Sequence, residues 1–109
     1  KIVNAMTLVR QQLPNAVLAV PGYYNPYGAF PGTPIDTISR YALPRLNQLL
    51  SFRTRQFNGA YADTYFGFVG RELELTWIGE DDIHPRSSGY SMYGDRLLKR
   101  LRLRQLPTP

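Results

Sequence analysis

The first residues of the chain follow an amphipathic pattern. Apolar positions recur every three to four residues, which is typical of a helix with one buried face. These positions are Ile2, Ala5, Met6, Val9 and Leu13. Pro14 ends the pattern. At the other end, no capping residue precedes Ile2, although a helix start normally has one. We therefore expect a helix that ends near residue 13 and a chain that starts inside a structural element.

Two short apolar segments predict the strands of a sheet. Residues 16–20 form a continuous apolar run that ends at Pro21, and such a run directly after a helix is typical of a strand buried on both faces of a parallel sheet. Residues 60–65 follow the turn signal Asn58-Gly59 and predict a second strand.

Two further helices are expected. One runs from about residue 39 or 43 to residue 57 and has leucines on one face. Pro44 lies either in its first turn or at a kink, because proline does not fit an undisturbed helix interior. Residues 66–79 show no clear period, and we expect Glu72 and Glu74 to face solvent there.

The last helix follows the only histidine, and its apolar stripe is predicted to pack on a sheet. The stripe comprises Tyr90, Tyr93, Leu97, Leu98 and Leu101.

The expected order of elements is helix, strand, helix, strand, helix, which is typical of an α/β protein. A parallel sheet of two strands is too narrow to bury three amphipathic helices and two apolar strands. Residues 1–109 are therefore interpreted as a portion of one domain whose sheet is completed by another segment.

Composition supports a globular chain. Hydrophobic residues make up 43% of the sequence and charged residues 19%, whereas disordered chains are poorer in apolar residues. No apolar run approaches the roughly 20 residues that a membrane-spanning helix needs, so no membrane span is predicted. Without cysteine, the chain has no disulfides and no thiolate metal site.

The net charge of +5 reflects a surplus of cations near the end of the chain. These cations are Arg96, Lys99, Arg100, Arg102 and Arg104. The helix dipole stabilises cations in the last turns of a helix, and no aromatic residues alternate with them to stack on bases. A nucleic-acid partner is therefore not predicted.

Residues 80–90 carry the candidate chemistry, with the sequence Glu-Asp-Asp-Ile-His-Pro-Arg-Ser-Ser-Gly-Tyr. The histidine, His84, has a side chain whose ordinary pKa near neutrality suits it to accept and return a proton. A carboxylate that accepts a hydrogen bond from one ring nitrogen would orient it. Asp81 ranks first for that role on spacing, and Asp82 is its competitor.

The residues around the histidine predict its local structure. Pro85 biases His84 toward a loop, because the residue before a proline avoids helical angles. Ser87 or Ser88 can cap the helix that follows, and Gly89 leaves room for a close backbone approach. The block is therefore predicted to be a loop that leads directly into a helix.

This block resembles the last conserved block of the SGNH or GDSL-type hydrolases, in which Asp-x-x-His-Pro is followed by Gly-Tyr and an amphipathic helix. The resemblance implies a Ser-His-Asp triad in which His84 is the general base and Asp81 the orienting acid. It also implies a carboxylic ester hydrolase, such as a lipase, esterase or acylhydrolase, that needs no metal or organic cofactor. The implied fold is a flavodoxin-like three-layer α/β/α parallel sheet, of which this sequence matches only the C-terminal half.

The family's nucleophile block is missing from the sequence. No serine stands in a Gly-Asp-Ser or Gly-x-Ser-x-Gly context. The expected partner is therefore an N-terminal segment or a second chain of the same protein that carries the Gly-Asp-Ser block, and this chain alone is expected to be inactive. The expected substrate is a small ester or a lipid, and a secreted or cell-envelope location is favoured over a cytoplasmic one.

A loop rich in proline, glycine and aromatic residues covers residues 21–37. It would leave the carboxyl end of the first strand, where open α/β sheets bind their ligands. The candidate substrate-lining residues are Tyr23, Tyr24, Asn25 and Tyr27. The alternative is an ordered loop that packs its own rings. The Tyr-Asn-Pro stretch also resembles one subgroup of bacterial SGNH hydrolases.

Two other classes of function fit parts of the sequence. Carboxylates beside an imidazole can bind a divalent ion, although ligands this crowded in sequence give poor coordination geometry. That set comprises Glu80, Asp81, Asp82 and His84. A non-catalytic interaction module would use the aromatic loop and the basic last helix, and its binding to a polyanion would depend steeply on salt.

Overall fold

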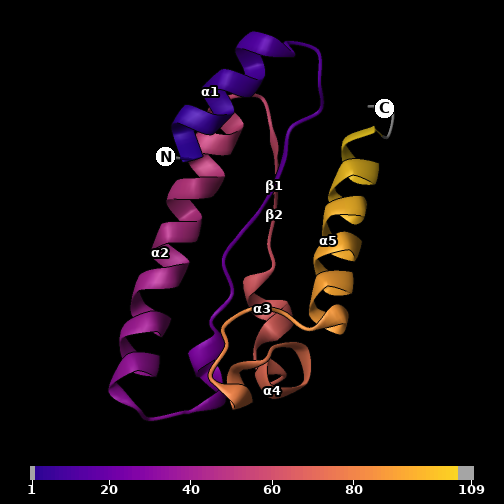
Figure 1. Ribbon diagram of the computed structural model, residues 1–109. Helices are drawn as coiled ribbons and strands as arrows, with labels where there is room; N and C mark the ends of the chain where they lie inside the picture. Colours follow the sequence, from indigo (N-terminus) through magenta and orange to yellow (C-terminus); the bar gives the residue numbers. More distant parts are fainter. Residues whose placement is uncertain (1, 106–109) are drawn as a thin grey trace.

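The computed structural model describes the backbone of residues 2–105 and the side chains of residues 4–102. Figure 1 shows its elements along the chain. In order they are α1 (Ile2–Gln12), β1 (Ala19–Pro21), the 3-10 helix η1 (Pro26–Ala29), α2 (Pro34–Gln56), β2 (Ala60–Ala62), α3 (Tyr65–Phe68), α4 (Glu72–Leu75), the 3-10 helix η2 (Ile78–Glu80) and α5 (Ser87–Gln105).

β1 and β2 form a two-stranded parallel sheet, and α2 connects them. Ala19 pairs with Ala60, and Pro21 pairs with Ala62. In Figure 1, α1 and α2 lie on one side of the strand pair and α5 lies on the other. The predicted α/β class is confirmed, because a parallel strand-helix-strand unit forms where the apolar pattern placed it. The wider flavodoxin-like sheet stays a prediction.

Each strand has only three residues and is shorter than the sequence predicted. β2 stops at Ala62 because the next side chains bond to backbone groups outside the sheet ladder. The Asp63 carboxylate accepts the N–H of Tyr65 at 2.9 Å, and the buried Thr64 hydroxyl donates to the carbonyl of Gly22 at 2.6 Å. These bonds end the strand and start α3.

α2 begins upstream of the predicted start. The Thr33 hydroxyl accepts the N–H of Asp36 at 3.4 Å, and Pro34 occupies the first turn, where a helix leaves its N–H groups unpaired anyway. Pro44 consequently lies in the helix interior rather than in its first turn. Beyond the C-terminus of α2, Asn58 adopts a left-handed conformation with φ of 56°.

A small apolar core joins α1, β1 and α2. Met6, Val20 and Leu50 are buried there. The partly buried side chains that pack against them are Leu18, Phe57 and Tyr61. The Arg10 guanidinium fixes α1 to this core, since it donates to the carbonyls of Phe57 at 2.8 Å and of Ala16 at 2.5 Å.

Residues 66–79 fold mainly as the short helices α3 and α4 and the start of η2. Glu72 is buried and accepts the N–H of Gly70 at 3.1 Å, so the expectation that it faces solvent was wrong. Glu74 is exposed and pairs with Arg71 at 2.8 Å, as expected of a surface carboxylate.

α5 packs on both strands, with only part of the predicted stripe turned inward. Tyr93, Leu97 and Leu101 are half-buried. Tyr90 and Leu98, in contrast, are more than half exposed, so the prediction that the whole stripe is core was wrong for these two. None of the described helices is long and apolar enough to cross a bilayer.

Candidate functional site

The backbone holds the histidine loop in place from both sides. The N–H of Trp77 donates to the carbonyl of His84 at 3.0 Å, and the N–H of Arg86 donates to the carbonyl of Leu75 at 2.7 Å. Pro85 forms an antiparallel bridge with Thr76. His84 therefore lies on a loop, as the following proline predicted, and the ends of that loop are anchored.

Side chains support the same loop. The Arg86 guanidinium donates to the carbonyl of Thr76 at 2.8 Å and lies 3.9 Å from the centre of the Trp77 ring. The Tyr24 hydroxyl donates to the carbonyl of Ile83. Burial raises the pKa of Tyr24, so this phenol stays protonated and remains a donor. These contacts tie the segment after β1 to the histidine loop.

An aromatic stack lies beneath this connection. The ring of Tyr24 stacks on that of the fully buried Phe68, with centroids 4.2 Å apart and planes at 15°. Tyr93 of α5 packs at a tilt against both rings. Rings in these orientations add stability beyond the area that they bury. The segment after β1, α3 and α5 thus form a packed aromatic base, to which the Tyr24 hydroxyl connects the histidine loop.

His84 and Asp82 form the polar pair of the site. The Nδ1 of His84 lies 2.6 Å from the Oδ1 of Asp82, and the backbone N–H of His84 donates to the same oxygen at 2.9 Å. These two hydrogen bonds hold the pKa of Asp82 below its ordinary value. The His84 side chain is 72% exposed and that of Asp82 50%. Among the described residues, the Nε2 of His84 has no hydrogen-bond partner.

The spacing argument favoured Asp81, but the structure brings Asp82 to the imidazole. Asp81 ends η2 in a left-handed conformation with φ of 60°, and its N–H donates to the carbonyl of Ile78 at 3.0 Å. No hydrogen bond or ion pair joins the Asp81 side chain to His84 within the described chain. A local signal could have found the partner, because aspartate side chains often accept the N–H two residues further on.

Gly89 allows the close approach that the sequence predicted. A Cβ atom at this position would overlap the carbonyl oxygen of Leu75 and lie 2.8 Å from the Cβ of Pro85. The first turn of α5 therefore packs directly on the segment that holds the histidine loop. Ser87 and Ser88 are the first two residues of α5, and the Ser88 hydroxyl donates to the carbonyl of Glu74 at 3.3 Å.

The candidate lining residues have different environments. Tyr23 is about half exposed, while its backbone is held by the Asn47 side chain through hydrogen bonds of 2.7 and 2.8 Å. Asn25 is buried, and its side-chain Oδ1 accepts the N–H of Tyr27 at 3.1 Å. Tyr24 supports the histidine loop. The structure thus gives Asn25 and Tyr24 structural contacts, and leaves Tyr23 as the most exposed of the four.

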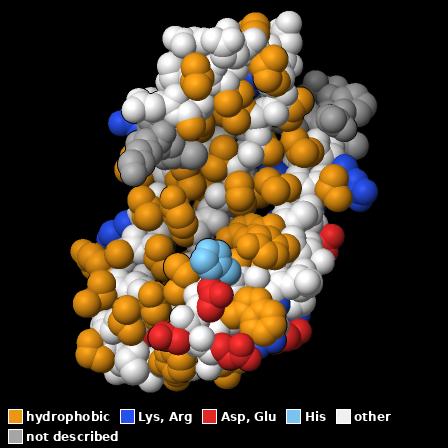
Figure 2. All heavy atoms as spheres, viewed as in Figure 1, with side chains coloured by type: hydrophobic (Ala, Val, Ile, Leu, Met, Phe, Trp, Pro, Cys, Tyr) orange, Lys and Arg blue, Asp and Glu red, His pale blue; other side chains and the backbone are white. Residues whose placement is uncertain are grey.

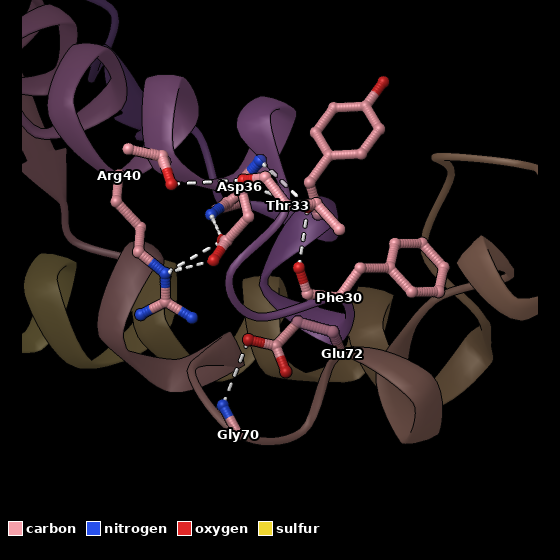
Figure 3. Close-up of polar contacts among 9 residues, drawn as sticks. Phe30, Thr33, Asp36, Arg40, Gly70 and Glu72 are labelled. Atoms are coloured by element: carbon pink, nitrogen blue, oxygen red, sulfur yellow. Dashed lines mark hydrogen bonds and ion pairs between the residues drawn. The ribbon is translucent and has the colours of Figure 1, made fainter.

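A polar cluster around the buried Asp36 joins the aromatic loop of residues 21–37 to α2 (Figure 3). Asp36 accepts Arg40 Nε at 2.7 Å and Asn25 Nδ2 at 3.1 Å. Burial raises the pKa of Asp36, but the hydrogen bonds from Arg40 and Asn25 outweigh it and keep that pKa below its ordinary value. The Asp-x-x-x-Arg spacing on α2, one helical turn, was the signal available in the sequence.

Three cavities lie beside the strands. One of about 410 Å³ between α2 and β2 is lined in part by Ser51, Tyr61 and Asp63. One of about 290 Å³ between β2 and α5 also has Tyr61 and Asp63 in its wall. The third, of about 260 Å³, has an apolar wall formed by α1 and β1. None of the three is lined by His84 or Asp82, so the polar pair is a surface feature of the described chain.

The carboxylates around His84 do not form a cation site in the described part of the chain. No group of three or more histidines, aspartates or glutamates lies close enough there to hold a metal ion. Asp82 contacts the imidazole, whereas Glu80 and Asp81 belong to the end of η2.

Comparisons of the chain with protein-family models, with curated protein sequences and with solved structures gave no match.

Proposed function

We propose that this chain supplies the general base and its orienting carboxylate to a serine hydrolase that cleaves carboxylic esters. The supporting observation is the 2.6 Å contact between His84 Nδ1 and Asp82 Oδ1, with Nε2 left open. A carboxylate in this position fixes the imidazole tautomer and stabilises the imidazolium, so that Nε2 can accept a proton. Asp82, rather than Asp81, takes the acid role in this proposal because it is the carboxylate in contact.

The proposed reaction has two halves. Nε2 of His84 takes the proton from a serine hydroxyl while the serine oxygen attacks the ester carbonyl carbon, and the resulting imidazolium then protonates the departing alkoxide. Water attacks the acyl-enzyme in the second half and gives its proton to the same nitrogen. The imidazolium then returns this proton to the serine oxygen as the bond between the acyl carbon and that oxygen breaks, which releases the carboxylic acid and restores the serine hydroxyl. Asp82 stays ionised throughout, as its lowered pKa allows.

The nucleophile is proposed to come from another segment. None of the described serines bonds to His84, and no Gly-Asp-Ser block occurs in the sequence. The open Nε2 is where that serine would bind. The position of the loop supports the proposal, since Tyr24 ties it to the carboxyl end of β1, the end at which α/β sheets place their ligands.

Labelling of the natively purified protein with a serine-directed fluorophosphonate tests the proposal. Intact-mass spectrometry should show one adduct on the polypeptide that carries the serine, and His84→Gln should abolish it while leaving the melting temperature unchanged. An unlabelled wild-type protein, or equal labelling of the variant, would contradict the proposal.

A further inference from the structure

The solvent-facing side of α2 carries an apolar stripe. Its members are Ile35, Ile38, Tyr41, Leu46, Leu49 and Phe52, all between 44% and 66% exposed. They recur at steps of three or five residues, which places them along one side of the helix. Figure 2 shows hydrophobic side chains along the left of the molecule, where α2 lies in Figure 1. We call this set the outer stripe.

The opposite face of α2 is more polar than the outer stripe. Its buried residues are Asp36, Asn47, Leu50 and Thr54. A surface helix normally turns its apolar face to the core and its polar face to water, whereas α2 exposes apolar side chains from residue 35 to residue 52, about five turns. Contiguous exposed apolar surface of this kind marks an interaction site.

The charges on α2 are almost all positive. Arg40, Arg45, Arg53 and Arg55 lie on the helix, and its single acid, Asp36, is buried and paired with Arg40 at 2.7 Å. Arg45 lies 3.6 Å above the centre of the Tyr41 ring, which puts a guanidinium within the outer stripe. Arg53 follows Phe52 in the last turns. No exposed carboxylate of α2 offsets these cations.

We propose that α2 binds the interface of an anionic phospholipid bilayer, with the helix lying parallel to the membrane plane. A long helix with leucine, isoleucine and aromatic side chains on one face and arginines beside them has the composition of interfacial helices. The apolar side chains would enter the headgroup and acyl boundary, and the arginines would pair with lipid phosphates. This binding does not depend on the proposed hydrolase activity.

The shape and charge of the outer stripe favour a bilayer over a protein occupant. None of the six stripe members lines any of the three cavities described above, whereas a partner helix usually binds in a groove. A second copy docked through the same stripe would add its own Arg45 and Arg53 to this face, and no exposed α2 carboxylate to meet them. Phosphate oxygens satisfy the guanidinium groups without that repulsion.

Flotation with vesicles tests the proposal on the native protein. We expect partition into vesicles of phosphatidylcholine mixed with phosphatidylglycerol, and little into vesicles of phosphatidylcholine alone. Replacing two stripe residues, Ile38→Ser with Leu49→Ser, should weaken partition by about tenfold or more, because each buries apolar area in the boundary. Arg45→Glu with Arg53→Glu should weaken it by a similar factor through the lost phosphate pairs.

Matched variants elsewhere act as controls. Arg96→Glu with Arg100→Glu makes the same change of charge on α5, and Leu73→Ser with Leu98→Ser removes two exposed leucines outside the stripe. Both should lower partition by less than about threefold, because neither lies on the proposed face. All four double variants should have the melting temperature of the wild type, because each replaces exposed side chains.

Several outcomes would overturn the proposal. One is equal loss in the α2 and control variants, which would mean general electrostatic attraction. Another is equal partition into neutral vesicles, or no partition at all. A dimer in analytical ultracentrifugation that the stripe variants dissociate, with no vesicle binding, would assign the stripe to a second copy. Fluorophosphonate labelling in parallel reports on the hydrolase proposal separately.

Discussion

Two acid-base pairs in this fold have opposite surroundings. Asp36 is buried and accepts hydrogen bonds from both Arg40 and Asn25, so all of its partners come from within the fold. Asp82 is half exposed, and its partner His84 keeps one ring nitrogen free of described contacts. The same kind of contact therefore stabilises structure in the first case and leaves a reactive group available in the second.

This difference separates stability from chemistry. A buried carboxylate needs every partner it has, since removing one leaves a polar group unpaired away from water. An exposed pair returns to water when it is broken and costs little. We expect substitutions at the buried pair to lower the free energy of unfolding with little effect on kcat. Substitutions at the exposed pair should lower kcat with little effect on the free energy of unfolding.

The largest expected effect comes from His84→Ala. In the protein assembled with the segment that carries the serine, loss of the general base should lower kcat/KM for a p-nitrophenyl ester by about 1000-fold or more. The free energy of unfolding should change by less than about 0.5 kcal/mol, because the side chain is exposed. Steady-state kinetics and urea unfolding measure the two. A variant with near wild-type turnover would remove His84 from the chemistry.

The next effect distinguishes the two candidate acids. Asp82→Asn should lower kcat by about 100-fold or more, because the amide no longer favours the reactive tautomer. Asp81→Asn is the matched control, and only a few-fold change is expected from a side chain without contact to the imidazole. If Asp81→Asn caused the greater loss, the acid role would return to the residue that spacing favoured.

Asn25→Ala tests the buried side of the comparison. It removes the amide that joins Asp36 to η1 and should lower the free energy of unfolding by about 1–3 kcal/mol. Turnover per folded molecule should remain close to wild type. Tyr23→Ala is the control on the exposed part of the same loop, and its free energy of unfolding should change less than that of Asn25→Ala. If Asn25→Ala were as stable as the wild type and had a raised KM, Asn25 would belong to the substrate wall instead.

The smallest expected effect is a change in acid stability. The folded pKa of Asp36 lies below its ordinary value of 3.8, so its stabilising contribution is complete above that value and is lost as the pH falls through the lower folded pKa. Asp36→Asn should therefore flatten the decline in melting temperature at acid pH. Asp81→Asn, which removes an exposed carboxylate, should leave that decline unchanged.

The backbone plan was more predictable than the polar contacts. Apolar runs and turn signals located both strands and the connecting helix, because local patterns of this kind report burial directly. The close approach at Gly89 was also predictable, because only a residue without a side chain lets two backbone segments come this close. The early start of α2 was missed because the Thr33-Pro34 start signal lies within the aromatic loop.

Some polar contacts have a local signal, as the Asp82–His84 and Asp36–Arg40 pairs do, but the burial of a polar side chain depends on tertiary geometry. Glu72 is buried only because Gly70 and the neighbouring η1 turn surround it, whereas Glu74, two positions later, faces solvent. Asp81 itself is left-handed at the end of η2, with φ of 60°, and this turn of the backbone separates its environment from that of Asp82. Which carboxylate reaches the imidazole is thus decided by one backbone conformation and not by sequence distance.

The parallel pairing of β1 and β2 has a consequence for how the chain folds. Ala19 and Ala60 must meet across about 40 positions, and contacts this distant in sequence are slow to form. α2 fills that interval with local hydrogen bonds and returns the chain to the level where β1 started. Substitutions that raise its helix propensity, such as Gln48→Ala, should therefore speed refolding in stopped-flow experiments if α2 is formed in the transition state.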